Sequence, residues 1–111
     1  MFRNIVLTEG TLYLAKNGLG WLMDSISIAT IMQKNVGEEE TVFWTLDVDL
    51  EKHSAILKAT DGGKLGNDEK ILWKESIPFT DCPEKQVRVW VGTTSDHQGR
   101  TIKVLYLPSE H

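Results

Sequence analysis

One cysteine and three histidines are the side chains best suited to nucleophilic or metal chemistry in this sequence. Cys82 precedes Pro83 and has no base beside it in sequence. The histidines, at positions 53, 97 and 111, lack the close spacing of metal ligands. Catalytic partners can be distant in sequence, so Cys82 and His97 as nucleophile and base form a minor alternative, without an evident third orienting group. We therefore predict no catalytic residue, no metal site and no bound cofactor.

Two further patterns resemble ligand sites but lack most of the residues that such sites require. Gly62-Gly63-Lys64 suggests a phosphate-binding loop, yet Leu65 follows where Ser or Thr is needed, so a hairpin loop is favoured. Asp47, Asp49 and Glu51 could face the same way on a strand. A calcium loop would need a glycine and more oxygen ligands at set spacings. A solvated outer face or sheet edge is the better interpretation of these acids.

The aromatic residues indicate a surface for a partner. Trp90 alternates with Val87, Val89 and Val91, so we expect Trp90 and Arg88 on the sheet face opposite the valines. Three other apolar residues are similarly out of phase with their strands: Phe43, Ile56 and Leu72. Together with Trp90 they could form an apolar patch, and self-association is its predicted role. The alternative is that the C-terminal segment or a long loop covers this face.

Length and composition predict one soluble α+β domain over residues 1–111. The chain has 41% hydrophobic and 25% charged residues, the balance of an ordinary globular protein. A net charge of −4 argues against nonspecific binding to nucleic acid or anionic membrane, although a local basic patch stays possible. A lone cysteine and the lack of a signal-peptide pattern or long apolar run predict a cytoplasmic location.

Five strands are expected after one helical region. Residues 42–48 alternate between apolar and polar side chains, and further strands are predicted over 54–60, 70–76, 86–92 and 101–107. A short strand at 4–7 precedes the helix, which gives the order β-α-β-β-β-β-β. One helix cannot serve as the crossover for several parallel strands, so we predict a mostly antiparallel sheet with the helix on one face.

The N-terminal helix is expected to start near Glu9, capped by Thr8, and to reach about Gln33. An unbroken helix would place these residues on one core-facing side: Thr11, Leu14, Gly18, Trp21, Leu22, Ser25, Ile28, Ala29 and Met32. Asp24 lies at the margin of this stripe beside Trp21, either as a partly buried general base or as a hydrogen-bonded structural group. Gly18 is either a small packing residue or, with Gly20, a break between two shorter helices.

Several segments together resemble a family of small bacterial domains, found especially in cyanobacteria, that is catalogued as a domain of unknown function. They are VLTEG (6–10), YLA (13–15), WLMD (21–24), FWTL (43–46), SAIL (54–57), IPFTD (77–81) and LYLPSEH (105–111). The resemblance implies an α+β fold and draws attention to Asp24, Thr80 and Asp81. The chain departs from the family pattern at Glu9, where aspartate is usual, and at Cys82, where an aromatic residue is usual.

These features favour a non-enzymatic cytoplasmic binding or protein-interaction module that forms a homo-oligomer, with no direct binding to nucleic acid or membrane. The candidate interaction or pocket residues are Trp90, Arg88, Asp24, Trp21, Thr80 and Asp81. One alternative is a small hydrolase or transferase with a pocket between helix and sheet that involves Asp24, Asp81 or Cys82. Another is an acidic accessory protein that acts on a nucleic-acid-binding partner.

Overall fold

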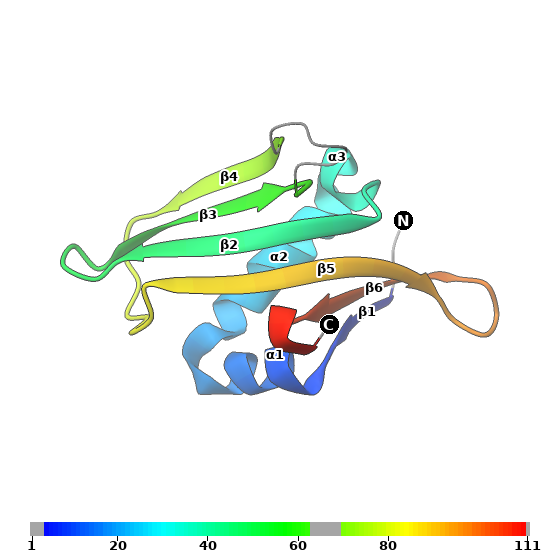
Figure 1. Ribbon diagram of the computed structural model, residues 1–111, viewed down its shortest axis with the longest axis horizontal. Helices are drawn as coiled ribbons and strands as arrows, with labels where there is room; N and C mark the ends of the chain where they lie inside the picture. Colours follow the sequence, from blue (N-terminus) through cyan, green and yellow to red (C-terminus); the bar gives the residue numbers. More distant parts are fainter. Residues whose placement is uncertain (1–3, 63–69, 111) are drawn as a thin grey trace.

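The computed structural model describes residues 4–62 and 70–110, which form a six-stranded sheet and a helical layer (Figure 1). The strands are β1 (Asn4–Leu7), β2 (Thr41–Asp49), β3 (Ser54–Thr60), β4 (Ile71–Ile77), β5 (Gln86–Ser95) and β6 (Thr101–Tyr106). The helices are α1 (Glu9–Leu14), α2 (Gly20–Met32) and α3 (Lys34–Gly37). A π-helical segment (Ala15–Leu19) joins α1 to α2, and a 3-10 turn (Pro108–Glu110) follows β6.

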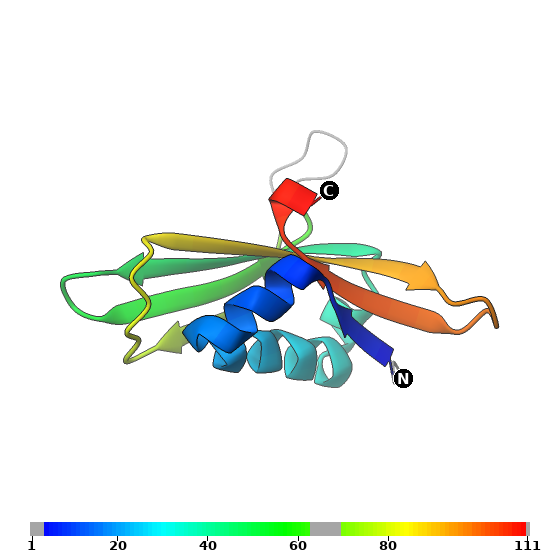
Figure 2. The same cartoon turned by 90° about the horizontal axis from the view of Figure 1, so that it is seen from below.

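The strand order across the sheet is β1-β6-β5-β2-β3-β4. β1 runs parallel to β6, and the other neighbouring strands pair antiparallel. Helices α1 and α2 lie on one side of the sheet, whereas the C-terminal turn lies on the other (Figure 2). We call these two sides the inner and the outer face. The predicted α+β class, with a mostly antiparallel sheet and helical cover on one face, is confirmed.

The core lies between the inner face and α2. Alternation along β2 buries Val42, Trp44 and Leu46, while the residues between them point to the outer face. The other strands and the helices complete the core with Leu57, Ala59, Val87, Val89, Val91, Leu105, Leu22, Met23, Ile26 and Ala29. Burial of these side chains removes apolar surface from water, at about 25 cal/mol per Å², and so fixes which face of the sheet the helices cover.

A kink separates α1 from α2. Asn17 (φ −113°, ψ 37°) and Gly18 (φ 100°, ψ −3°) leave the helical conformation inside the π-helical segment. Gly18 suits this place because a residue without Cβ adopts positive φ at little cost. Of the two interpretations of Gly18, the structure supports the break. Gly18 is exposed and a Cβ there would meet nothing within 4 Å, so the prediction of a packing residue is wrong.

The kink also overturns part of the predicted core stripe. α2 buries Leu22 and Ile26, which are 1% and 0% exposed, whereas Ile28 and Met32 are 60% and 71% exposed. The prediction that Ile28 and Met32 face the core is therefore wrong. A stripe counted at regular helical spacing from α1 has the wrong phase in α2, because the π-helical turn and the positive φ of Gly18 rotate one helix relative to the other.

Leu72 is a second correction, on the sheet. It was expected in the outer apolar patch, but it is 8% exposed and belongs to the core cluster. The register between β3 and β4 shifts at this point, since Ala59 pairs with Trp73 and Thr60 pairs with Ile71. Such a bulge inserts one residue into β4 and changes the face to which the neighbouring side chains point.

The C-terminal turn holds the start of α1. Thr8 caps α1 as predicted, and its side chain accepts a hydrogen bond from the Thr11 amide. The Thr8 hydroxyl donates to Glu110 Oε1 at 2.7 Å, and the Gly10 and Leu107 amides donate to the same carboxylate at 3.1 and 2.8 Å. These hydrogen bonds lower the pKa of the Glu110 carboxyl, that from Thr8 most strongly. Residues about a hundred positions apart in sequence are thereby joined.

Across residues 4–62 and 70–110, no helix has both the length and the apolar character needed to cross a membrane.

Candidate functional site

The outer face carries a row of three aromatic side chains. Phe43 of β2 lies opposite Trp90 of β5, and Trp90 lies opposite Tyr106 of β6. The rings of Phe43 and Trp90 pack edge to face with centroids 5.0 Å apart, and those of Trp90 and Tyr106 do so at 6.0 Å. This arrangement matches the preference of aromatic quadrupoles for T-shaped contacts. We call Phe43, Trp90 and Tyr106 the aromatic row; each of the three is partly exposed.

Two glycines allow the backbone to approach the ends of this row. Gly62 has φ 78°, and a Cβ at this position would overlap the Phe43 ring. A Cβ on Gly92 would lie 3.2 Å from Cε1 of Tyr106. Residues with larger side chains at these positions would have to displace the rings. The backbone therefore helps to fix where the outer rings lie.

A second row, two residues further along the strands, is cationic. Lys74 of β4 lies opposite Lys58 of β3, Lys58 opposite Thr45 of β2, and Thr45 opposite Arg88 of β5. We call Lys74, Lys58 and Arg88 the cationic row. A spacing of two residues puts it about 7 Å from the aromatic row on the same face. Within the described residues, no carboxylate lies at ion-pair distance from any of these three cations.

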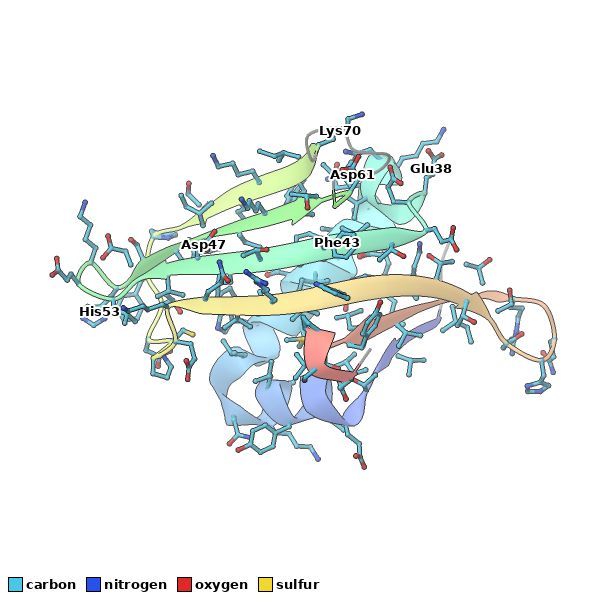
Figure 3. The ribbon with its side chains drawn as sticks, viewed as in Figure 1. Glu38, Phe43, Asp47, His53, Asp61 and Lys70 are labelled. Atoms are coloured by element: carbon cyan, nitrogen blue, oxygen red, sulfur yellow. The ribbon has the colours of Figure 1, made fainter. Side chains whose placement is uncertain are left out.

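Hydrogen bonds connect the polar side chains next to the cationic row on the outer face. Arg88 Nε donates to Gln86 Oε1 at 2.9 Å, and Gln86 Nε2 donates to Asp47 Oδ1 at 2.7 Å. The chain of hydrogen bonds orients the guanidinium of Arg88, while Asp47 stays exposed at the end of the face. Phe43 and Asp47 can be followed along β2 in Figure 3, where the helices lie behind the sheet.

Two members of each row, Phe43 and Trp90 of the aromatic row and Lys58 and Arg88 of the cationic row, border a shallow groove of about 380 Å³. Its lining combines aromatic, cationic and hydroxyl side chains: Phe43, Thr45, Asp47, Lys58, Thr60, Gly62, Gln86, Arg88 and Trp90. The volume falls in the range of small-ligand sites. The groove therefore offers an aromatic wall for stacking and positive charge for an anionic group.

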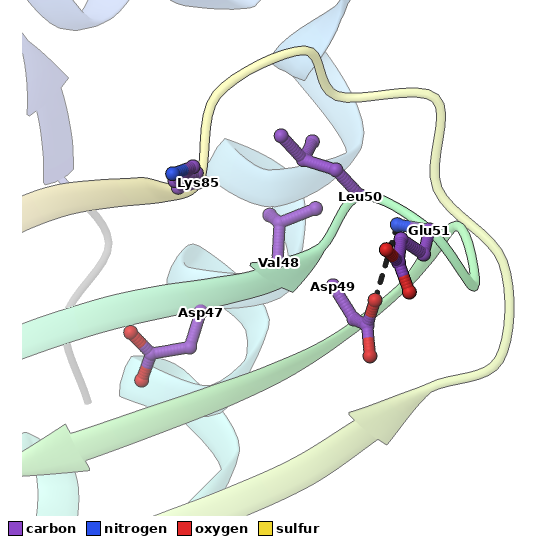
Figure 4. A pocket seen from close by; sticks show the side chains of 6 residues that line it. All are labelled: Asp47, Val48, Asp49, Leu50, Glu51 and Lys85. Carbon is purple, nitrogen blue, oxygen red and sulfur yellow. Dashed lines mark hydrogen bonds between the residues drawn. The ribbon is translucent and has the colours of Figure 1, made fainter.

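The acidic residues predicted to be solvated lie around the β2–β3 turn. They border a larger, open hollow of about 500 Å³ together with Leu50 and Lys85 (Figure 4). Asp49 Oδ1 accepts hydrogen bonds from the Glu51 and Lys52 amides at 3.1 Å each, so this carboxylate stabilises the turn. Among the described residues, no group of three or more His, Cys, Asp or Glu side chains is arranged to hold a metal ion.

Thr80 and Cys82 have structural contacts in the β4–β5 loop. Thr80 is buried, its amide donates to the His53 carbonyl at 2.7 Å, and its hydroxyl accepts from the Cys82 amide at 3.2 Å. The Cys82 thiol is buried and donates to the Glu84 carbonyl at 3.8 Å. Cys82 precedes β5 and His97 follows it, so the two residues lie at opposite ends of this strand. The alternative of a Cys82–His97 pair is therefore wrong.

The kink and this loop form a further pocket of about 390 Å³. It is lined by Tyr13, Leu14, Asn17, Gly18, Leu19, Asp81, Cys82, Pro83 and Glu84. Asp81 and Cys82 thus meet a cavity beside a helix, as the alternative of a small enzyme expects. Asp24 does not line it. Asp24 is exposed on α2, which corrects the expectation of a partly buried carboxylate, and Trp21 is half-buried against the core.

The six candidate residues therefore lie in three separate places. Trp90 and Arg88 share the outer groove, Thr80 and Asp81 lie in the β4–β5 loop, and the other two lie on α2. Two residues of the phosphate-loop pattern, Gly63 and Lys64, lie outside the described residues. His111 also lies outside them.

Lys103 is a buried ionisable residue that was not among the residues expected to matter from the sequence. It is 2% exposed, and its Nζ donates to the Glu39 carbonyl at 2.9 Å and to Thr93 Oγ1 at 2.5 Å. Burial lowers the pKa of the Lys103 ammonium, and the Glu39 charge partly opposes this shift. The alternation of β6 contains the signal, because position 103 has the same phase as the core residue Leu105.

Comparison with known proteins identifies the family. The model of a Family of unknown function (DUF6876) matches residues 1–111, so the chain belongs to this family. No curated protein and no solved structure matches the chain. The expected resemblance to a family of unknown function is confirmed.

Proposed function

We propose that this member of the DUF6876 family is a non-enzymatic binding module whose ligand-binding surface is the outer face of the sheet. The observation that carries this proposal is the pair of adjacent aromatic and cationic rows on a face that α1 and α2 leave uncovered (Figure 2). Partly exposed aromatic side chains, next to cations with which no carboxylate of the described residues forms an ion pair, are typical of binding surfaces. A bacterial cytoplasmic location is part of this proposal, and the lone Cys82 supports it.

Self-association belongs to this proposal, but through α2 rather than through the aromatic patch first expected. Ile28, Ile31 and Met32 are 60%, 43% and 71% exposed and lie on one side of α2, because their spacing is three and four residues. A helix that is apolar on both sides favours burial of its second side. Two copies paired antiparallel about a twofold axis would set Ile28 of one copy near Ile31 of the other and keep the two Asp24 carboxylates apart.

Light scattering across a concentration series tests the association and its location. We expect the mass to approach twice the 12.5 kDa of the chain at high concentration. Met32→Glu should give a monomer, because it places a charge in the proposed interface, whereas Trp90→Ala should leave the dimer intact. A wild-type monomer at every concentration would refute self-association. A dimer that is weakened by Trp90→Ala and not by Met32→Glu would refute the proposal of an open outer face.

A second candidate function is a small hydrolase or transferase that uses the pocket at the kink. The observation that favours it is that Asp81 and Cys82 both line one cavity. Alkylation of the folded protein by iodoacetamide distinguishes the two functions. Fast alkylation of Cys82, compared with the unfolded chain, would favour the enzyme, since a reactive thiol must be accessible and ionised. Strong protection would favour a structural thiol and the binding module.

A further inference from the structure

We propose that the outer face binds a single strand of nucleic acid, with bases stacked on the aromatic row and phosphates paired with the cationic row. This inference rests on the proposed function in one respect, namely that the outer face is the ligand-binding surface. It names the class of that ligand from the chemistry of the two rows.

The cationic row is the first argument. Lys58 and Lys74 lie directly opposite each other on neighbouring strands, and like charges in this position destabilise a sheet. Arg88 adds a third positive charge across Thr45. Because no carboxylate of the described residues pairs with these cations, an external anion would relieve their repulsion. Neighbouring strands are about 4.8 Å apart, so the row suits several anionic groups along a chain.

The aromatic row is the second argument. Single-stranded nucleic acids bind proteins through aromatic side chains that stack on bases and through cations that follow the backbone. Trp90 and Phe43 line the same groove as Lys58 and Arg88, so both kinds of contact are available to one ligand. A separation of about 7 Å between the rows is comparable to that between base and phosphate within a nucleotide. A duplex would hide its base faces from the rings, so a single strand fits better.

The distribution of charge reconciles this ligand with a net charge of −4. Glu9 lies on α1 and Asp24 on α2, and these helices are on the other side of the sheet (Figure 2). On the outer face, Asp47 is hydrogen-bonded to Gln86 at the end of the groove, and the Glu110 carboxylate in the C-terminal turn accepts hydrogen bonds from Thr8, Gly10 and Leu107. The expectation of no nucleic-acid binding was based on the charge of the whole chain, whereas binding depends on the local charge of one face.

Fluorescence anisotropy with a labelled oligothymidylate of about ten nucleotides tests the proposal. We expect binding at low salt that weakens as salt rises, because bound cations release counterions from the phosphates. Lys58→Gln with Lys74→Gln should weaken binding about tenfold or more and reduce the salt dependence. Lys34→Gln is the control for the loss of one positive charge elsewhere, because Lys34 is an exposed lysine on α3; this variant should have no effect beyond that of net charge.

Substitutions of Trp90 separate the contribution of base stacking to binding from that of charge. Trp90→Ala should weaken binding about tenfold, while Trp90→Phe should retain most of it, since phenylalanine can still stack. Circular dichroism and thermal unfolding establish that each variant is folded. Absence of binding at low salt, equal loss in Lys34→Gln, or no loss in Trp90→Ala would overturn the proposal. Tighter binding of polyglutamate, of duplex DNA or of thymidine monophosphate than of the oligonucleotide would also overturn it.

Light scattering distinguishes failure of the nucleic-acid proposal from failure of the proposed function. If the oligonucleotide does not bind but Trp90→Ala leaves the dimer intact, the ligand class is wrong and the outer face stays available for another ligand. If Trp90→Ala breaks the dimer, the outer face is a protein interface and both proposals fail.

Discussion

Gly62 shows how a residue without a side chain shapes the proposed binding surface. Its backbone lies against the Phe43 ring, at one end of the aromatic row, with φ in the region that favours glycine. A substituted Cβ would therefore have two effects, strain in the backbone and displacement of the ring. Gly99 provides a comparison, because it has almost the same φ (79°) and nothing within 4 Å of a Cβ position.

We predict that Gly62→Ala lowers the free energy of unfolding by more than Gly99→Ala does. Backbone strain alone should cost about 1–2 kcal/mol at either position. The additional loss at Gly62 reports the overlap with Phe43 and should be accompanied by a change in the near-ultraviolet circular dichroism of Trp90. Urea denaturation measures both losses. Equal losses would show that the ring moves aside freely.

Lys103 makes stability depend on pH at alkaline values. Its pKa in the folded protein lies below the ordinary value of 10.5, so between these two values the unfolded chain binds more protons than the folded chain. The contribution of this residue to the free energy of unfolding therefore rises with pH across that interval and is constant outside it. The charged form is the one that burial penalises.

We predict that Lys103→Met removes this rise. The difference in free energy of unfolding between wild type and Lys103→Met, measured by urea denaturation at several pH values, should increase in favour of the wild type through the interval. The control is Lys34→Met, since Lys34 is an exposed lysine. A difference independent of pH would mean that the ammonium of Lys103 has an unshifted pKa.

At the scale of elements, sequence periodicity predicted strands well and helix phase poorly. The alternation of apolar and polar residues located β2 to β6. It also placed Trp90 on the other face of the sheet from the valines of β5, because the period of a strand depends on local geometry alone. Ile28 and Met32 were misplaced because a helix keeps its phase only while its turns are regular. Leu72 was misplaced for a similar reason, since a bulge in pairing has no clear signature in one strand.

The candidate site could be predicted only in part. Trp90 and Arg88 were found from alternation, but Lys58 and Lys74 were not singled out. Their role depends on the register between β3 and β4, which places them opposite each other. Register is a tertiary property, so a row that crosses four strands cannot be read from single segments.

We predict that Gly18→Ala destabilises the protein by about 1 kcal/mol or more. In a regular helix the same change stabilises by about 1 kcal/mol, because alanine has the higher helix propensity. The sign therefore reports the kink, where Gly18 has φ 100°. Thermal unfolding measures the effect. A stabilised variant would indicate that the helix becomes continuous without a loss of stability elsewhere in the protein.

At the scale of the whole molecule, the carboxylate of Glu110 links the C-terminal turn to the start of α1. Hydrogen bonds lower its pKa, so the stability that it contributes is present above the ordinary pKa of a glutamate and is lost as pH falls through the lower folded value. We predict that Glu110→Gln is less stable than wild type at neutral pH and that the difference disappears in acid. Urea denaturation from neutral to acidic pH measures it, with the exposed Glu84→Gln as the control.

The parallel pairing of β1 with β6 has a consequence for folding. Val6 pairs with Val104, so one edge of the sheet cannot form until nearly the whole chain is available. On the ribosome, the antiparallel ribbon of β2 and β3 can form early, while β1 must wait for β6, the strand with which it pairs. Contacts between residues so distant in sequence have a large loop-closure entropy and slow the search for the native state. We therefore expect the docking of β1 to be the late event of folding.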